Sequence, residues 1–318
     1  MMGFRTQTAA YSPDHDGEGA SVIELPVVRV TGIETKDTAE KLAVEEPLEI
    51  QLSHGPIRSR DVKSISVTMR TPGHDFELAA GFLLTEGVLS DVLDIAEMRY
   101  VARTVSPASD LMGTVLPFGA QRNTLRVDLL PGVQVSLSTL ERNFYTTSSC
   151  GICGKASLLA LRAVCPPRIE NEFVIDPALL YTFPERLRSA QTVFNCTGGL
   201  HAAGLFDSAG ALHSLREDVG RHNAVDKLVG AAFLDDRTPL RNRLLMLSGR
   251  ASFELLQKAV MSGIPMVVSV GAPSSLAVQV AKEFNITLVG FLRDDHFNVY
   301  NGAEHLSAHS LQSVGRHP

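Results

Sequence analysis

The sequence contains no tryptophan, only four cysteines and no long apolar run. Four cysteines in 318 residues are too few for a disulfide framework, so a close pair of them indicates catalysis or metal binding in a reducing compartment. No apolar stretch reaches the roughly 18 residues that span a bilayer, and the first residues lack a basic segment followed by an apolar run. We therefore expect a cytoplasmic protein with no membrane partner.

Positive charge is not in excess either. The chain has 29 basic and 35 acidic residues, a formal net charge of −6, so it lacks the basic balance typical of nucleic-acid binding and we expect no nucleic-acid partner. Its hydrophobic content of 44% is that of an ordinary globular protein. A chain of this length can bury a sizeable core, in two domains or one large one.

The pattern of apolar residues divides the chain into regions. Residues 1–25 are polar and lack periodicity, which predicts a disordered leader. Residues 26–147 predict a β-rich region with one embedded helix, because short alternating runs recur on either side of a helical pattern at 76–85. The strands expected there are 27–30, 48–52, 65–69, 98–105, 125–130 and 144–147.

Residues 148–310 predict an α/β domain, followed by a tail at 311–318. A strand at 193–196 and a hairpin around 207–210 come first. Strands then alternate with helices, which implies a mixed, largely parallel sheet with helices on its faces. The expected helices are 218–234, 253–261 and 274–284, and the expected strands are 244–247, 266–270, 286–291 and 297–300.

The motif Ser148-Ser149-Cys150-Gly151-Ile152-Cys153-Gly154-Lys155 lies between a strand-like run and a helix-like run. At a helix start the backbone N–H groups, the helix dipole and a nearby ammonium group favour thiolate over thiol. The glycines allow a sharp turn and a close approach by a large partner. Cys150 and Cys153 are therefore candidate nucleophiles.

Other interpretations of this pair stay open. A structural zinc site needs four ligands, and Cys165 and Cys196 stand alone in the sequence. A thioredoxin-type disulfide also uses Cys-x-x-Cys, although here a long β-rich region precedes the pair. A turn with two half-buried cysteines is the remaining structural interpretation.

We predict a binding face at the ends of the strands of the α/β domain. Ligands of such sheets bind at strand ends, and the helix N-termini there offer N–H groups to anions. Neither a dinucleotide fingerprint nor a phosphate loop is present, and such loops can also merely cap helices. Arginine suits the bidentate geometry of a phosphate. The candidates are Ser248, Gly249, Arg250, Ser274, Ser275, Arg221, Arg293, His201 and His222.

The histidines and carboxylates raise the question of a metal. Histidine and aspartate can both bind zinc, and the candidates here are His201, Asp218, His222 and Asp226. Their spacing argues against a zinc site, so we predict no metal site. Zinc deamination is also disfavoured, because no His-x-Glu unit accompanies the Cys-x-x-Cys. His74 and Asp75 could line a site at a helix start, or Asp75 could only cap that helix.

Several of these motifs together resemble the formate dehydrogenase accessory sulfurtransferase family, FdhD. The similarity covers nearly the whole chain beyond the leader, with the motifs in the same order. They are Glu45-Glu46-Pro47-Leu48, residues 71–78, Ser149–Lys155, Thr197-Gly198-Gly199-Leu200-His201-Ala202-Ala203, residues 217–227, residues 248–254, residues 272–277 and Gly290-Phe291-Leu292-Arg293.

The resemblance implies a homodimer with a cytidine-deaminase-like α/β core that acts as a sulfur carrier. Its cysteine would accept a persulfide from a cysteine desulfurase and pass sulfur to the bis(molybdopterin guanine dinucleotide) molybdenum cofactor, which formate dehydrogenase then receives. By position Cys150 would bear the persulfide and Cys153 would be its neighbour. The resemblance also implies a cofactor-binding stretch at Phe291, Leu292, Arg293, Asp294, Asp295 and His296. The alternative is a molybdenum-cofactor chaperone without sulfur chemistry.

Overall fold

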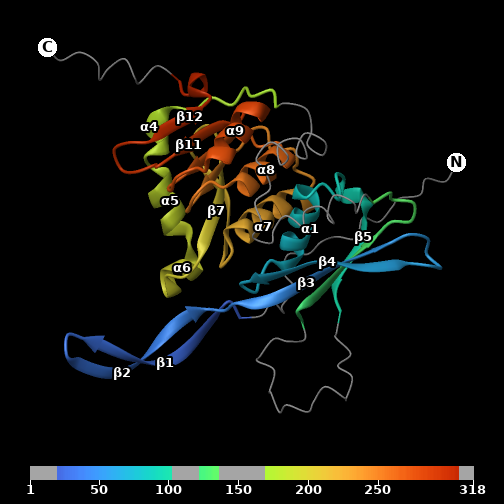
Figure 1. Cartoon of the computed structure of the whole chain (residues 1–318), viewed down its shortest axis with the longest axis horizontal. Coiled ribbons are helices and arrows are strands. Elements are labelled where there is room, and N and C mark those ends of the chain that lie inside the picture. The colour runs from blue at the N-terminus through green and yellow to red at the C-terminus, as the bar shows by residue number, and fades with distance from the viewer. Residues whose placement is uncertain (1–19, 102–121, 136–168, 308–318) are drawn as a thin grey trace.

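The computed structural model describes residues 20–101, 122–135 and 169–307 (Figure 1). The cysteine motif with Cys150 and Cys153 lies outside the described residues, as do the predicted strand 144–147, most of the predicted leader and the tail. The described chain forms a projecting hairpin, a small sheet next to it, and a larger sheet with helices on both faces (Figure 1).

The larger sheet is mixed and has six strands in the order β12-β11-β10-β9-β7-β8. β9, β10 and β11 are parallel, whereas β7, β8 and β12 pair antiparallel with their neighbours. The α/β class is confirmed, but the parallel part is confined to three strands, because the β7–β8 and β11–β12 connections are too short for a crossover. The strands are β7 (His201–Phe206), β8 (Leu212–Asp218), β9 (Leu244–Leu247), β10 (Met266–Ser269), β11 (Thr287–Gly290) and β12 (Asn298–Asn301).

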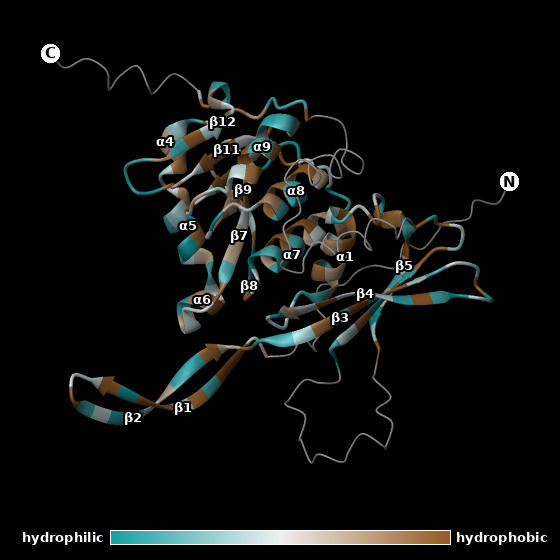
Figure 2. Ribbon diagram, viewed as in Figure 1, coloured by the Kyte–Doolittle hydropathy of each residue, from teal (hydrophilic) through white to brown (hydrophobic). Residues whose placement is uncertain are grey.

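Helices cover both faces of this sheet, which explains why β9, β10 and β11 are buried along their whole length and mainly apolar. Leu245 and Leu247 belong to the core on the side of α7, α8 and α9, whereas Leu244 and Met246 belong to the core with residues of α4 and α5. Figure 2 shows hydrophobic residues in the sheet that lies between these helices. The described helices are α1 (Asp75–Thr85), α4 (Pro177–Leu180), α5 (Phe183–Ala190), α6 (Thr192–Thr197), α7 (Arg221–Leu234), α8 (Phe253–Met261) and α9 (Ser275–Phe284), with 3₁₀ turns at Val92–Asp94 and Ala303–His305.

The smaller sheet has the strand order β4-β3-β6-β5 and confirms the expected β-rich region. Its embedded helix α1 packs on α7, so the N-terminal region and the α/β region share one hydrophobic core. Gly81 and Gly230 lie at this crossing, where each backbone touches the other helix. The strands are β3 (Glu46–His54), β4 (Asp61–Arg70), β5 (Ile95–Tyr100) and β6 (Thr124–Leu129).

The hairpin pairs β1 (Val22–Thr31) with β2 (Glu34–Ala43) in a separate two-stranded sheet. The strand expected at 27–30 is confirmed within β1, and β1 begins inside the residues predicted as leader. β2 was not predicted, because its sequence is mainly charged residues and threonine and lacks an apolar alternation.

The strand predicted at 193–196 is wrong, since these residues belong to helix α6. The carboxylate of Glu217 on β8 accepts hydrogen bonds from the amides of Val193 (3.0 Å) and Phe194 (2.8 Å), which satisfies the first N–H groups of the helix. Gly198 then ends α6 in the left-handed conformation. A carboxylate distant in sequence thus outweighs the strand preference of valine and phenylalanine.

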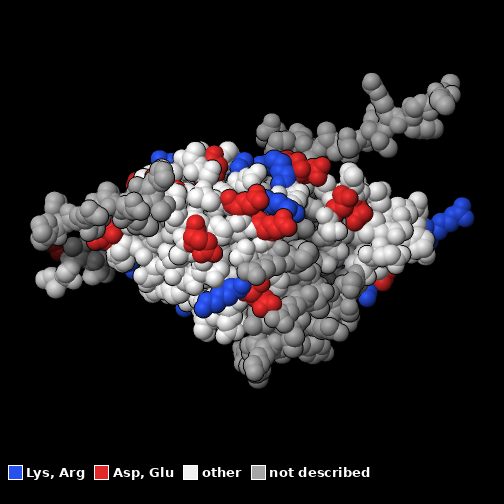
Figure 3. All heavy atoms as spheres, turned by 90° about the horizontal axis from the view of Figure 1, so that it is seen from above, with Lys and Arg blue, Asp and Glu red and all other residues white. Residues whose placement is uncertain are grey.

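On the face seen in Figure 3, the Lys and Arg side chains of the described residues lie among Asp and Glu rather than in a continuous patch. In the part of the chain that the structure describes, each helix is too short or too polar to cross a bilayer.

Candidate functional site

The loops that follow β9, β10 and β11 are hydrogen-bonded to one another at the carboxyl edge of the sheet. The amide of Gly271 donates to the carbonyl oxygen of Gly249 (2.9 Å), and the amide of Phe291 donates to that of Gly271 (3.1 Å). The amide of Ser274 donates to the carbonyl oxygen of Ala251 (2.9 Å). The structure therefore brings together the loops of the predicted binding face, as parallel strand ends require.

The N-terminus of α7 brings a neutral histidine to the loop after β9. Nε2 of His222 lies 3.4 Å from the hydroxyl oxygen of Ser252 and 3.9 Å from a carboxylate oxygen of Glu254. Burial lowers the pKa of His222 to about 4, and the positive charge of Lys258 acts in the same direction. The ring is therefore uncharged near neutral pH and can accept or donate a hydrogen bond.

Arg221 has a donor without a partner. Its Nε is buried and makes no hydrogen bond to the described residues. Burial lowers the pKa of His201, and the charge of Arg221 lowers it further. The ring of His201 lies against Gly249, where a side chain would meet its Nδ1 at 3.4 Å. A buried guanidinium N–H that lacks an acceptor favours an anion such as phosphate at this edge.

The other predicted site residues divide into two groups. The hydroxyl oxygen of Ser248 accepts the amide of Ala202 (2.9 Å), and that of Ser274 caps α9 by accepting the amide of Ala277 (3.1 Å). The side chain of Leu292 is buried in the core and supports its loop from inside, so it is not available as a contact for a ligand. The exposed members of the predicted face are His201, Arg250, Ser274, Ser275, Arg293, Asp294, Asp295 and His296.

A cavity of about 560 Å³ lies beside the carboxyl edge. His201 and Ser248 line it, which places two predicted residues at a concave surface. The residues of α5 and α6 that form its wall were missed, because a strand at 193–196 would not present them together. The remaining lining residues are Pro184, Leu187, Arg188, Gln191, Phe194, Gly198, Gly199, Leu200 and Val270.

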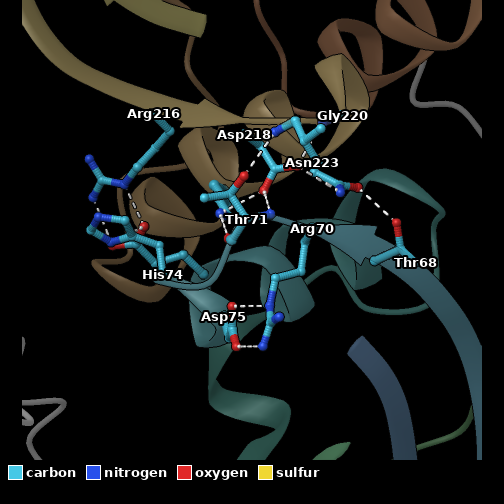
Figure 4. A network of polar contacts seen from close by, with 12 residues as sticks. Thr68, Arg70, Thr71, His74, Asp75, Arg216, Asp218, Gly220 and Asn223 are labelled. Carbon is cyan, nitrogen blue, oxygen red and sulfur yellow. Dashed lines mark hydrogen bonds and ion pairs between the residues drawn. The ribbon is translucent and has the colours of Figure 1, made fainter. Parts of the chain in front are cut away.

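Two motifs that the sequence singled out meet in a buried polar network (Figure 4). Nζ of Lys227 lies 2.7 Å from Asp218 and donates to the carbonyl oxygen of Thr71 (2.8 Å). Asp218 also accepts from the amides of Thr71 and Gly220 and from the side chain of Asn223. Since Asp218 and Lys227 are fully buried, the network fixes the start of α7 against the turn before α1.

Asp75 takes neither of the two roles predicted for it. Its carboxylate pairs with the guanidinium of Arg70 through two hydrogen bonds (3.0 and 2.9 Å) and accepts from the hydroxyl of Tyr100 (3.1 Å). His74 is the residue that precedes α1, in a left-handed conformation, and its Nδ1 lies 3.1 Å from Glu77. Asp75 is buried and joins β4 to α1 (Figure 4).

Asp226, the second carboxylate weighed as a metal ligand, also has a buried partner. It lies 3.0 Å from Nζ of Lys258 and accepts a hydrogen bond from the hydroxyl of Thr85 (2.7 Å). Over residues 20–101, 122–135 and 169–307, no group of three or more His, Cys, Asp or Glu side chains is placed to hold a metal ion.

The comparisons with known proteins agree on one family. The model of the FdhD/NarQ family matches residues 43–307. The sulfur carrier protein FdhD of Streptomyces coelicolor is 47% identical over 291 residues, which cover 91% of this chain and 97% of that protein. The sulfur carrier protein FdhD of Mycobacterium tuberculosis is 50% identical over 275 residues, 84% of this chain and 92% of that protein.

A solved structure supports the fold. The crystal structure of a candidate formate dehydrogenase accessory protein from Desulfotalea psychrophila superposes with a TM-score of 0.65. It covers 91% of this chain and all of that one at 24% sequence identity, a level at which the similarity concerns the fold alone.

Proposed function

The chain belongs to the FdhD/NarQ family, and from that premise we propose that it carries sulfur to a molybdenum cofactor. A cysteine desulfurase supplies the sulfur, and the acceptor is the bis(molybdopterin guanine dinucleotide) cofactor destined for formate dehydrogenase. Membership of a family whose matching relatives are named sulfur carrier proteins is the observation that carries the proposal. The working unit we propose is a homodimer in the cytoplasm.

Cys150 is the proposed acceptor of sulfur. Its thiolate attacks the outer sulfur of the desulfurase persulfide, so that a new S–S bond forms on Cys150 and the desulfurase cysteine leaves as a thiolate. Attack of the Cys153 thiolate on Sγ of Cys150 would then release hydrosulfide and leave a Cys150–Cys153 disulfide. A dithiol reductant would reduce this disulfide and regenerate the two thiols. Both cysteines precede the described α/β strands in the sequence.

The carboxyl edge of the larger sheet is the proposed docking place of the cofactor. Its support is the hydrogen-bonded cluster of strand-end loops and the buried donor of Arg221, which suit the phosphates of a nucleotide. His201 and His222 stand beside that donor, and the lowered pKa of each keeps its ring neutral near pH 7. Arg293 and His296 lie on the exposed loop after β11, where they can reach a bound nucleotide.

A cofactor chaperone without sulfur chemistry is the second candidate. The observation in its favour is the loop cluster at the carboxyl edge, whose hydrogen-bonded strand ends and buried Arg221 donor suit a nucleotide whether or not sulfur is transferred. The two candidates differ in whether the protein itself ever holds sulfur.

The test is an intact-mass measurement after incubation with a cysteine desulfurase and cysteine. We expect the wild-type chain to gain the mass of one sulfur atom and the Cys150→Ala variant to gain none, because the alanine removes the nucleophile. The control is Cys196→Ala, which removes an exposed thiol and should gain sulfur like the wild type. An unmodified wild type in the presence of active desulfurase, or an adduct that persists in Cys150→Ala, would contradict the proposal.

A further inference from the structure

The β1–β2 hairpin, residues 22–43, projects from the rest of the described chain and exposes apolar side chains on both of its faces (Figure 2). A two-stranded hairpin alone is marginally stable in water, and contiguous exposed apolar surface marks a place of interaction. Strand residues alternate between faces, and residues that stand opposite each other share a face. The exposed large apolar residues are Ile23, Leu25 and Leu42 on one face, Val28 and Val30 on the other, and Ile33 at the turn.

A second group of exposed apolar side chains forms a stripe on β4, an edge strand of the smaller sheet. The stripe consists of Val62, Val67 and Met69, which stand opposite every second residue of β3 and therefore share one face of the sheet. The β3 residues that point the other way, such as Ile50, belong to the hydrophobic core. The hairpin and the stripe hold nine of the fourteen large apolar side chains that are exposed in the described residues, so this surface is concentrated in two places.

The two places do not cover each other within one chain. Outside its own two strands the hairpin contacts mainly α6, and the side chains of Val30 and Val67 are 63% and 64% exposed. The edges of the hairpin oppose the addition of a further strand, because Pro26 lacks an N–H in the middle of β1 and β2 carries Lys36 and Lys41. A partner therefore meets the faces of the hairpin.

We propose that a second copy of this chain covers both places: in a two-fold dimer the hairpin of each copy packs on the β4 stripe of the other. Two-fold symmetry makes each contact reciprocal, so a single kind of contact buries both apolar surfaces of both copies. This inference rests on the homodimer of the proposed function and names the surface that forms it.

The distribution of charge favours the contact of hairpin with stripe over that of hairpin with hairpin. The hairpin has four acidic and three basic residues, whereas residues 56–63, at the Val62 end of the stripe, have three basic residues and one acidic residue. The two surfaces thus carry opposite net charges, which attract each other across an interface. Specific interfaces take about 20–30 residues a side, and the hairpin together with the stripe is of that size.

The experiment is the mass of the full chain in solution, measured by size exclusion with light scattering over a series of concentrations. We expect the wild type to have about twice the chain mass of 34.3 kDa. Val30→Lys on the hairpin and Val67→Lys on the stripe each place a charge in an apolar contact. Each should raise the dissociation constant of the dimer about tenfold or more, because symmetry repeats the substitution at two contacts. Leu93→Lys is the matched control, since Leu93 is 65% exposed and lies outside both surfaces, and it should dimerise like the wild type.

The substituted side chains are exposed, so circular dichroism should show the three variants folded like the wild type. The inference is overturned if Val30→Lys or Val67→Lys dimerises like the wild type, or if Leu93→Lys weakens the dimer as much as they do. A dimer that survives in either variant contradicts this surface and leaves the proposed homodimer standing, whereas a monomeric wild type contradicts both. Sulfur loading of Cys150 in the wild type, measured by mass, tests the proposed sulfur transfer separately.

Discussion

Lys227→Met is expected to destabilise the protein by about 3–5 kcal/mol, the usual cost of removing one partner of a buried ion pair. The carboxylate of Asp218 would stay in a fully buried position without its cation, and the carbonyl oxygen of Thr71 would lose its donor. Since folded domains are stable by only about 5–15 kcal/mol, this loss is a large fraction of the total. The measurement is the free energy of unfolding from denaturant titration, followed by circular dichroism.

Two further variants show whether the unpaired charge causes the loss. Adding Asp218→Asn to Lys227→Met should restore part of the stability, because an amide in that position is neutral and can still accept from Gly220. Lys282→Met replaces an exposed lysine on α9 and should change stability by less than about 0.5 kcal/mol. A Lys227→Met protein as stable as Lys282→Met would show that the network does not hold the two turns together.

Gly230→Ala is expected to destabilise the protein although alanine is the better helix former. A Cβ at Gly230 would lie 1.8 Å from the carbonyl oxygen of Glu77, and a Cβ at Gly81 would lie 1.9 Å from that of Asp226. Both obstacles are backbone atoms, so α1 and α7 would have to separate. Overpacking typically costs about 1–3 kcal/mol and occasionally more. We expect the upper end here, above the gain of about 1 kcal/mol from helix propensity.

The thermal midpoint measures this effect. Gly81→Ala and Gly230→Ala should each lower it by several degrees. Gly199→Ala is the control, because a Cβ there meets its nearest atoms only at 3.9 Å and the backbone is not left-handed. A midpoint for Gly230→Ala at or above that of the wild type would mean that the two helices do not touch at this point.

The sequence predicted the α/β part well because its signals are local. β9, β10 and β11 are buried on both faces and therefore read as short apolar runs, and the helices between them keep an apolar face. The alternation of strands and helices also predicts that the loops with Ser248 and Ser274 lie at one edge of the sheet.

The wrong predictions share a physical cause, since each depends on a side-chain partner that the pattern of apolar residues does not reveal. α6 is a helix because Glu217 on β8 satisfies its first amides, which no local pattern reports. Asp75 and Asp218 looked like site residues because they are polar and stand at turns, but Arg70 and Lys227 hold them in the interior. The cavity wall that contains Gln191 was missed because the neighbouring segment 193–196 is a helix and not the strand that its sequence predicts.

The measurement that tests the central claim most directly follows a sulfur label. A desulfurase and cysteine labelled with a heavy isotope of sulfur are used to load the protein with sulfur. The loaded protein is then separated from both and mixed with cofactor that lacks its sulfur ligand. We predict that the label leaves Cys150 and appears on the cofactor, in step with activation of formate dehydrogenase. If formate dehydrogenase becomes active while the label stays on the protein, or if Cys150→Ala activates it equally well, the protein does not deliver the sulfur.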